Sequence, residues 1–381
     1  MIQQVFFILA LLFIAPYTLL IIFIVAGWVK TPCCRKQTIS QPLPKVSVIV
    51  AFRNEAANLP ALLSCLSAQQ YPLHRLEVLM SDDFSEDHGT DIILKHTTQH
   101  PVFQLIRPGN STHRGKKAAL RRALDKARGE IIITTDADCT MDDQWVKNLA
   151  SPFENNAVQM AMGPVEIINT GSMFSHMQAL EFSSLVGTAG GAASWGKPVL
   201  CNGANLAFRR KTVQELLPQL PGQKYLSGDD MFMMHAIQKH HPGSIRFVKN
   251  RGAMVSTRPA ASVKVFFMQR MRWVSKSTGF TDLFTLLTGA IVALSNLFMA
   301  ISLVLTVVFF QKLLVFVVGL WIIKALVDAS LVMPVTNFMG QPRLMRYFPV
   351  LSMLYPFYVS TTLAAGFVFP NRWKSRKVNT A

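Results

Sequence analysis

The chain has 381 residues, enough for one large domain or two of ordinary size. Half of its residues are hydrophobic and only 15% are charged, so the composition favours a membrane protein over a soluble one. The net charge of +17 would also suit a nucleic-acid-binding protein, but many basic residues lie beside apolar runs, as juxtamembrane residues do, which argues against a nucleic-acid partner. The five cysteines show neither a disulfide framework nor zinc-site spacing.

The first apolar run predicts a membrane anchor. Residues 5–29 carry no charge, and at about 1.5 Å per residue they can cross a hydrocarbon layer of about 30 Å. Basic residues follow this run, at Lys30, Arg35 and Lys36, and none precedes it, which is the wrong order for a cleaved signal peptide. We therefore expect the N-terminus outside and a short cytoplasmic linker at residues 31–44.

The next region alternates strand and helix patterns. Short β-branched runs typical of buried parallel strands occupy residues 46–52, 76–81, 102–106 and 130–135. Helical spacing occupies residues 59–69, 90–96 and 117–128. This alternation predicts a doubly wound α/β domain, whose ligands bind at the carboxyl ends of the strands.

Beyond residue 168 the alternation weakens. We predict a helix at residues 174–186, a loop at 187–196 and a strand at 199–208. Residues 261–277 follow as an amphipathic helix with an apolar stripe and many basic residues, a pattern that favours the membrane interface.

The last third predicts three further membrane spans, at residues 283–310, 313–335 and 349–369. Lys324 and Asp328 lie four residues apart, so they either neutralise each other within the membrane or form a functional polar pair.

The membrane topology contains a conflict. Three crossings from a cytoplasmic Lys276 place the C-terminal tail outside, although its basic residues favour the inside. The residues concerned are Arg372, Lys374, Arg376 and Lys377. Either one run does not cross fully, with a break at Pro356, or the rule fails in this chain.

Acidic residues occur where the predicted strands end. The segment VSVIVAFRNE ends in Arg53, Asn54 and Glu55, and the segment MSDDFSED includes Asp83. The segments TTDAD, with Asp136 and Asp138, and SGDD, with Asp229 and Asp230, follow in order. The two carboxylates of a DxD motif can hold Mg²⁺ or Mn²⁺ against a diphosphate. Taken alone this motif is a weak signal, because aspartates at strand ends also form caps and turns.

A second group of polar residues lies on the predicted interfacial helix. In QRMRW, the residues Gln269, Arg272 and Trp273 are spaced i, i+3 and i+4 and so share one face. Arginine binds phosphate with two hydrogen bonds, and an indole offers a flat apolar surface for a sugar ring. The alternative is an ordinary interfacial helix with an arginine and a tryptophan at the headgroups. Lys116 and Lys117 follow Gly115 and could reach a phosphate, but they also open a helix with a basic face, and we favour the solvated face.

In this order, VSVIVAFRNE, DDFSED, DAD, GDD and QRMRW resemble the motifs of the membrane-bound family 2 glycosyltransferases. That branch includes cellulose, chitin and hyaluronan synthases and ceramide glucosyltransferase. The match covers residues 46–273, and the flanking apolar runs resemble that branch too. The resemblance implies a GT-A fold, which is a Rossmann-like α/β domain, together with transmembrane helices.

The resemblance also implies roles for individual residues. Those expected to bind the nucleotide-sugar are Arg53, Asn54, Glu55, Asp83, Asp136, Gln269, Arg272 and Trp273. Those expected beside the donor sugar and acceptor are Asn202, Gly203, Asn205, Asp229 and Trp273. Asp138, with Asp136, would hold the divalent cation, and Asp230 would be the general base. Gly228 and Asp229 precede Asp230 where the family usually has an acidic or hydroxyl residue and then Glu, so the choice of base is open and we favour Asp230.

The predicted activity is a single inverting transfer from a UDP-sugar to a lipid or glycan, in cell-envelope polysaccharide or glycolipid synthesis. A processive polysaccharide synthase, a polyprenyl-phosphate sugar synthase, and a membrane scaffold or transporter are the alternatives. We expect a multi-pass protein of the cell inner membrane with a cytoplasmic catalytic domain. The predicted parts are a transmembrane helix (1–30), the transferase domain (31–258), the interfacial helix (259–280) and a C-terminal transmembrane region with a basic tail (281–381).

Overall fold

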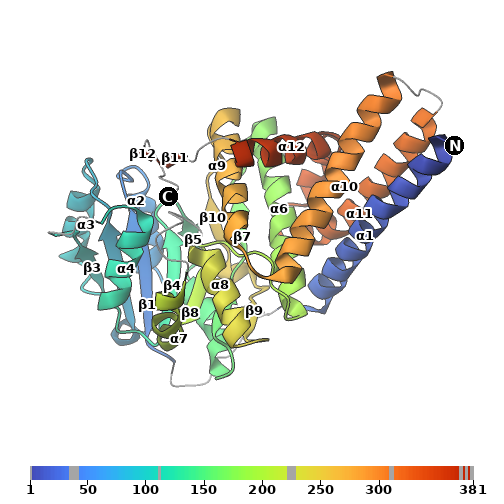
Figure 1. Ribbon diagram of the computed structural model, residues 1–381. Coiled ribbons are helices and arrows are strands. Elements are labelled where there is room, and N and C mark those ends of the chain that lie inside the picture. The colour runs from blue at the N-terminus through green and yellow to red at the C-terminus, as the bar shows by residue number, and fades with distance from the viewer. Residues whose placement is uncertain are drawn as a thin grey trace. The chain divides into compact units, whose positions relative to one another are not determined.

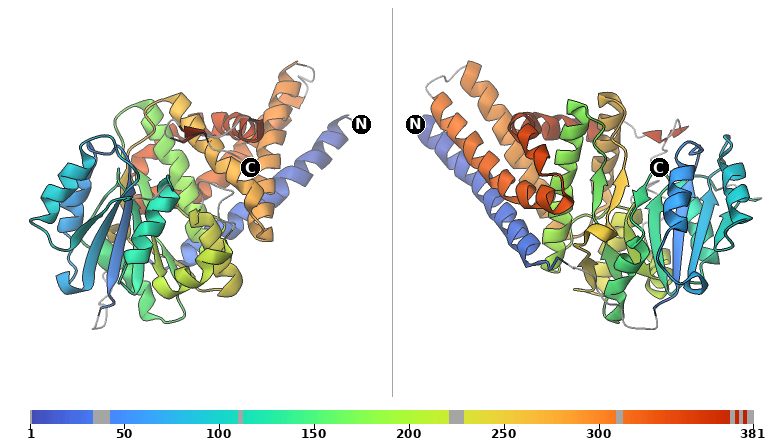
Figure 2. Two further views of the ribbon diagram at one scale, coloured as in Figure 1. Left: turned by 60° about the vertical axis from the view of Figure 1, so that its left-hand side comes forward. Right: turned by 180° about the vertical axis from the view of Figure 1, so that it is seen from behind.

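The computed structural model describes residues 2–33, 43–109, 113–220, 229–308, 313–368, 372–373 and 376–377. They form two compact units, which Figures 1 and 2 show from three directions. An α/β unit comprises Thr31–Ile168 and Gly196–Arg258, and a helical unit comprises Met1–Lys30, Asn169–Trp195 and Pro259–Thr380. The segment Asn169–Trp195 thus groups with the apolar helices, although it lies within the stretch that we assigned to the transferase domain.

The described part of the α/β unit is built on a seven-stranded sheet in the order β3-β2-β1-β4-β8-β6-β9. Its strands are β1 (Val46–Phe52), β2 (Leu76–Asp82), β3 (Phe103–Ile106), β4 (Ile131–Asp136), β6 (Met160–Met162), β8 (Leu206–Arg209) and β9 (Ile245–Phe247). The four strands predicted before residue 136 pair in parallel as expected. Strand β8 is antiparallel to both β4 and β6. A smaller sheet joins β5 (Thr140–Met141), β10 (Val255–Thr257) and β7 (Val165–Ile167).

The strand register brings the ends of three strands to one edge of the sheet. Phe52, the last residue of β1, pairs with Asp82 at the end of β2. Ala51 pairs with Asp136, the last residue of β4. Because carboxyl ends of parallel strands share an edge, the polar residues that follow β1, β2 and β4 lie close together.

Helices connect and cover these strands. They are α2 (Leu59–Ser67), α3 (Gly89–Thr97), α4 (Lys116–Lys126), α5 (Trp145–Ala150), α7 (Arg210–Leu216) and α8 (Asp229–His240). The first three coincide closely with the helices predicted from apolar spacing, and α4 packs against β1 and β2. The predicted strand at 199–208 is shorter in the structure, because only its last residues belong to β8.

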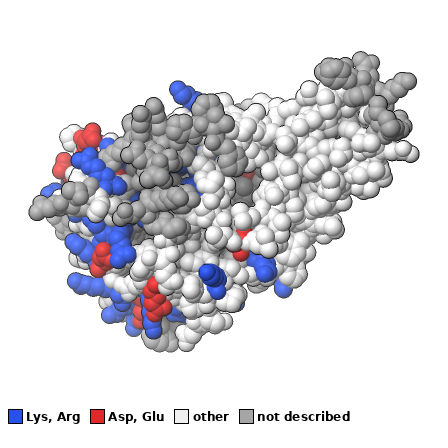
Figure 3. Space-filling model, viewed as in Figure 1, with Lys and Arg blue, Asp and Glu red and all other residues white. Residues whose placement is uncertain are grey.

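The helical unit contains α1 (Ile2–Lys30), α6 (Met173–Ser194), α9 (Val263–Lys276), α10 (Leu283–Val308), α11 (Leu314–Met339) and α12 (Phe348–Val368). Among the described residues, four helical segments are long and apolar enough to cross a membrane, namely Gln4–Lys30, Leu283–Val307, Leu314–Met339 and Pro342–Gly366. Figure 3 agrees, since charged side chains gather over the α/β unit and the described surface of the helical unit in that view is almost uncharged.

One of the two explanations of the topology conflict required a break at Pro356, but α12 continues through this proline. The described tail consists of β11 (Arg372–Trp373) paired with β12 (Arg376–Lys377). Lys374 lies outside the described residues.

The predicted loop at residues 187–196 is also wrong, because α6 continues to Ser194. Its glycines serve close helix packing rather than a turn. A Cβ placed on Gly191 would lie 2.2 Å from the carbonyl oxygen of Ile24 in α1, and a Cβ on Gly27 would lie 2.1 Å from the carbonyl oxygen of Gly191. Small residues let two helices approach backbone to backbone, which is common among membrane helices.

Lys324 and Asp328 form an ion pair inside the helical unit. The Lys324 Nζ lies 2.7 Å from Asp328 Oδ2, and the Tyr17 hydroxyl donates a 2.5 Å hydrogen bond to Asp328 Oδ1. The pair therefore fastens α1 to α11 in a neutral arrangement, the first of the two alternatives that the spacing left open.

Candidate active site

The loops after β1 and β2 hold each other through polar contacts. The Arg53 guanidinium donates to Glu86 at 3.2 Å. The backbone amide of Glu86 donates to the Asn54 side chain at 2.8 Å, and Asn54 itself has a left-handed backbone with φ of 51°. Asparagine tolerates that conformation better than most residues. The segment from Arg53 to Glu55 is thereby fixed against the loop that carries Asp83.

Asp83 is buried directly after β2, with 1% of its surface exposed. Its Oδ1 accepts a 2.6 Å hydrogen bond from the backbone amide of Gly115, the residue that precedes α4. The next residue, Lys116, forms an ion pair with Asp136 of the DxD motif. Our interpretation of Lys116 as part of a solvated face is therefore wrong, and the first turn of α4 bridges Asp83 and the DxD motif.

Asp138 lies in a more acidic environment than an ordinary surface carboxylate. Burial raises its pKa, and the negative charges of Asp136 and Glu55 raise it further. Its Oδ2 accepts a 3.3 Å hydrogen bond from the Thr257 hydroxyl on β10. The residues that follow β1 and β4 thus act on one another electrostatically at the same edge of the sheet.

The carboxylates at this edge of the sheet suit a divalent cation that is bound partly by the protein and partly by substrate oxygens. Among the described residues no group of three or more His, Cys, Asp and Glu could by itself hold a metal ion. Asp136 and Asp138 supply hard carboxylate oxygens, and Mg²⁺ is commonly bound by one or two carboxylates together with substrate phosphates. The concentration of negative charge around Asp138 favours a cation there.

Hydrogen bonds connect Asp230 to the strand that carries the DxD motif. Asp230 Oδ2 accepts from the backbone amide of Gly203 at 3.1 Å, and the Gly203 carbonyl accepts from the Thr134 hydroxyl of β4 at 3.0 Å. Its Oδ1 accepts a 2.9 Å hydrogen bond from the backbone amide of the next residue, Met231. The Asp229 side chain, which sequence placed beside the sugar, lies outside the described residues, as does Gly228.

The segment before β8 has two parts. Asn202 and Gly203 form a loop beside Asp230, and Asn205 fixes this loop to the rest of the α/β unit. Asn202 accepts a 3.0 Å hydrogen bond from the Ala204 amide. Asn205 is fully buried and receives a 2.9 Å hydrogen bond from the indole of Trp145. Its amide group donates to the carbonyls of Pro164 and Ala253, at 2.7 and 2.8 Å. With its side chain engaged in this way, Asn205 fixes the loop rather than facing a ligand.

The QRMRW residues belong to the helical unit, on α9. Ser262 caps this helix by accepting a 3.3 Å hydrogen bond from the Val265 amide. Gln269 accepts a 2.7 Å hydrogen bond from Arg270, a residue that sequence reasoning did not select. Arg272 and Trp273 are both half-buried.

Thr257 in the α/β unit and Arg270 in the helical unit are polar residues that sequence reasoning did not select. Lys116 was considered as a phosphate contact because it follows Gly115, but the solvated helix face was preferred. Thr257 and Arg270 depend on pairings between distant segments, for which a single sequence carries no sign.

The α/β unit is thus a Rossmann-like sheet with carboxylates gathered at the ends of its strands. Its fold has a counterpart among solved structures, the mannosyltransferase PcManGT from Pyrobaculum calidifontis in complex with GDP-Man and Mn²⁺. The two chains superpose with a TM-score of 0.58 at 18% identity, over 93% of this chain and 99% of that one. The fold is therefore that of the GT-A nucleotide-sugar transferases, as the motifs predicted.

Sequence comparison assigns part of the chain to a family. Residues 47–217 match the model of Glycosyl transferase family 2. The chain is 26% identical over 238 residues to the "probable glycosyltransferase" YdaM of Bacillus subtilis, covering 61% of this chain and 54% of that protein. It is 30% identical over 112 residues to the beta-monoglucosyldiacylglycerol synthase of Synechocystis, covering 29% of this chain and 23% of that one. The chain thus spans about half of the first relative and a quarter of the second. It carries a family 2 glycosyltransferase domain, as the motifs predicted.

Proposed function

We propose that this transferase moves a sugar from a UDP-sugar to a lipid acceptor, with inversion, at the cytoplasmic face of the membrane that its apolar helices cross. The bacterial inner membrane is the expected location. The beta-monoglucosyldiacylglycerol synthase among its relatives is named for a glycolipid product, which supports a lipid acceptor. A glycan acceptor, in a processive polysaccharide synthase, is the alternative that product analysis distinguishes.

The observation that carries this proposal is the meeting of four acidic segments in the α/β unit. The Gly115 amide donates to Asp83, and the neighbouring Lys116 pairs with Asp136. Burial and the charges of Asp136 and Glu55 raise the pKa of Asp138. Thr134 and Gly203 connect the same strand to Asp230. A nucleotide-sugar transferase needs this combination, because it has to bind the donor's nucleoside and diphosphate and hold the acceptor hydroxyl in line with the anomeric carbon and the leaving oxygen.

The proposed chemistry is a single displacement. Asp230 accepts the proton of an acceptor hydroxyl while that oxygen forms a bond to the anomeric carbon. The bond between this carbon and the diphosphate oxygen breaks on the opposite face, so the configuration inverts. Asp230 ends the step protonated and the nucleoside diphosphate leaves with an additional negative charge.

The negative charge on the leaving diphosphate needs positive partners. We assign this role to Lys116 and, through the family resemblance, to Arg272 with Gln269 and Trp273 closing on the diphosphate and acceptor. Asp138 and Asp136 would hold a divalent cation, which supplies Lewis-acid stabilisation when bound. Asp83 with the Arg53 to Glu55 segment would line the nucleoside pocket, and the loop at Asn202 and Gly203 would adjoin the donor sugar.

The test is sugar transfer by the purified full-length protein in nanodiscs, with nucleotide release measured over a panel of UDP- and GDP-sugars and lipid extract as acceptor. Asp230→Asn should lower kcat by about 10² to 10⁴, the usual contribution of a positioned base. The matched control, Asp125→Asn, makes the same chemical change on an exposed aspartate that pairs with Arg121 on α4 and should retain activity.

Near-normal turnover of Asp230→Asn with an unchanged unfolding curve would refute the assignment of the base. EDTA should abolish transfer, and Mn²⁺ or Mg²⁺ should restore it. Long carbohydrate chains in the product would replace the lipid-acceptor proposal with a processive synthase. Transfer to a polyprenyl phosphate alone would indicate a sugar-phospholipid synthase.

A further inference from the structure

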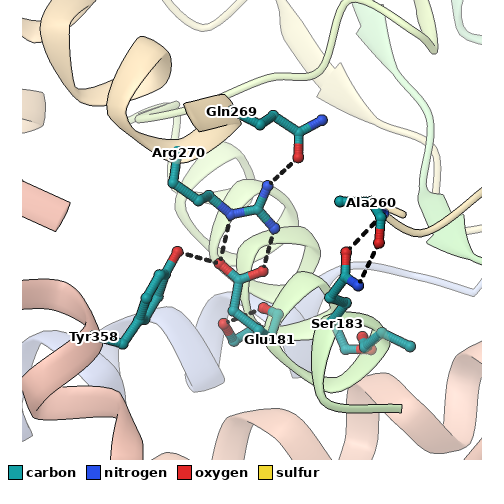
Figure 4. A network of polar contacts seen from close by, with 9 residues as sticks. Glu181, Ser183, Ala260, Gln269, Arg270 and Tyr358 are labelled. Atoms are coloured by element: carbon teal, nitrogen blue, oxygen red, sulfur yellow. Dashed lines mark hydrogen bonds and ion pairs between the residues drawn. The ribbon is translucent and has the colours of Figure 1, made fainter. Parts of the chain in front are cut away.

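Arg270 lies beside the motif residues of α9 but points into the helical unit, where it forms a buried ion pair with Glu181 of α6. Its Nη2 lies 2.5 Å from Glu181 Oε2 and its Nε lies 3.2 Å from Glu181 Oε1, so the carboxylate is held by two parallel hydrogen bonds. The Arg270 and Glu181 side chains are only 4% and 5% exposed. Figure 4 shows the pair between α9 and α6, with Tyr358 of α12 on its far side.

The same guanidinium touches two of the three motif side chains. Its Nη1 donates a 2.7 Å hydrogen bond to Gln269 Oε1. Its Cζ lies 4.2 Å from the centre of a Trp273 ring, within the range of a cation–π interaction. Phe266 flanks the guanidinium on the same helix, with its ring centre 4.5 Å from Cζ. The orientations of Gln269 and Trp273 are thus coupled to one buried charge.

Stability alone is a weak reason to retain this ion pair. Replacing a buried ion pair by apolar residues is often neutral or stabilising, because removing both charges also removes the cost of taking them out of water. A planar guanidinium held by two hydrogen bonds has one orientation, which an apolar side chain of similar size does not impose. The pair is better suited to orienting its neighbours than to increasing the free energy of unfolding.

Tyr358 extends the contact to α12, since its hydroxyl donates to Glu181 Oε1 at 3.4 Å. The Glu181 carboxylate on α6 therefore contacts both Arg270 on α9 and Tyr358 on α12, and it connects these three helices. The Lys324–Asp328 pair provides a comparison, because it is buried in the same unit and also has a tyrosine partner, Tyr17. Within the described part of the chain, its hydrogen bonds and ion pair involve none of the motif residues.

We propose that Arg270 and Glu181 are positioning residues that hold the Trp273 indole and the Gln269 amide in one orientation for catalysis. This role rests on the proposed function, in which Gln269 and Trp273 close on the donor and acceptor. Arg270 acts through these two side chains and through the placement of α9 against α6. Loss of the pair then leaves α9 folded but its motif side chains in several orientations.

Two double variants test this with equal chemical changes. Arg270→Met with Glu181→Gln removes the pair and keeps an acceptor for Tyr358, and Lys324→Met with Asp328→Asn does the same for the other pair and Tyr17. In full-length protein in nanodiscs, the first should lower kcat by about 10- to 100-fold with little change in KM for the donor, since small misplacements of reacting groups cost up to about 100-fold. The second should leave kcat within about threefold of the wild type. Arg270→Lys should not restore full activity, because an ammonium lacks the fork and the plane.

A readout independent of activity is ¹⁹F NMR of protein labelled with 5-fluorotryptophan, with the Trp273 signal assigned from Trp273→Phe. We expect a single Trp273 resonance in the wild type and in the Lys324 and Asp328 double variant. In the Arg270 and Glu181 double variant we expect either several Trp273 resonances or one resonance with a strongly shifted frequency. An unchanged Trp273 signal, or equal loss of kcat in both double variants, would overturn the proposal. If the wild type transfers no sugar from any donor, the proposed function fails and the NMR result alone decides whether the pair orients Trp273.

Discussion

Replacing Lys116 by methionine is expected to tighten the binding of Mn²⁺ and to weaken the binding of the sugar nucleotide. The Lys116 ammonium pairs with Asp136 of the DxD motif and so competes with any cation at these carboxylates. Two unit charges about 4 Å apart attract each other by about 4 kcal/mol at an effective dielectric constant near 20. The two side chains are 37% and 35% exposed, so solvent reduces this to roughly 1 kcal/mol.

About 1 kcal/mol corresponds to roughly a fivefold change in affinity. Lys116→Met should therefore bind Mn²⁺ about three- to tenfold more tightly in the absence of nucleotide, while KM for the donor rises because a positive partner of the diphosphate is gone. Free Mn²⁺ measured by electron paramagnetic resonance during titration of the nanodisc protein gives the first quantity, and nucleotide release gives the second. Lys126→Met is the control, since it removes the same charge from the exposed end of α4, about 15 Å along the helix.

The reasoning fails if Lys116→Met binds Mn²⁺ more weakly than the wild type, or if Lys126→Met produces the same tightening. Opposite changes in the two affinities are the distinctive result, because a general loss of folding would weaken both. The thermal unfolding of both variants should match the wild type within a few degrees, since a partly exposed pair contributes at most about 1 kcal/mol.

Two further predictions separate ligand-binding residues from structural ones. Burial and the charges of Asp136 and Glu55 raise the pKa of Asp138, so the folded state binds this proton more tightly than the unfolded state and stability falls as pH rises through that interval. Asp138→Asn should then raise the melting temperature at neutral pH while it abolishes transfer. Glu55→Gln should move the acid limb of the pH profile of kcat/KM to lower pH. An unchanged position of that acid limb would contradict the effect of the Glu55 charge on Asp138. Asn205→Ala should lower the free energy of unfolding by about 2 to 5 kcal/mol, because it removes the acceptor of the buried Trp145 indole and the side-chain donor to the carbonyls of Pro164 and Ala253. Asn202→Ala should have little effect on chemical denaturation, and equal losses in the two variants would refute this division.

The early part of the α/β unit could be predicted closely because local signals agree there. β-branched runs fixed β1, β2 and β4 within a residue or two, and each run ends where a carboxylate or an arginine begins. The same signals failed at Gly187 and Gly191, where glycine permits helix contact rather than chain reversal. Local sequence does not distinguish these two uses of glycine, because the residues that pack on them are distant in the chain, Ile24 of α1 on Gly191 and Val335 of α11 on Gly187.

The site shows the same limit. Order along the chain was enough to select Asp83, Asp138 and Asp230, since each follows a predicted strand or opens a helix. It did not select Arg270, and it left Lys116 between a phosphate contact and a solvated face, because the ion-pair partners of both residues lie on other segments. A basic helix face and a lysine aimed at a DxD motif have the same composition, and only the position of α4 at the sheet edge separates them.

The two units differ in how their buried or partly buried charges are paired. In the helical unit, Arg270 pairs with Glu181 and Lys324 pairs with Asp328, so each buried charge has an opposite partner. At the sheet edge, burial raises the pKa of Asp138 and the nearby charges of Asp136 and Glu55 raise it further, while Lys116 pairs with Asp136. Perturbed carboxylate pKa values are common at functional sites. The raised pKa of Asp138 therefore supports the cation site that we propose at this edge of the sheet, and the buried Arg270–Glu181 ion pair supports the positioning role that we propose for it.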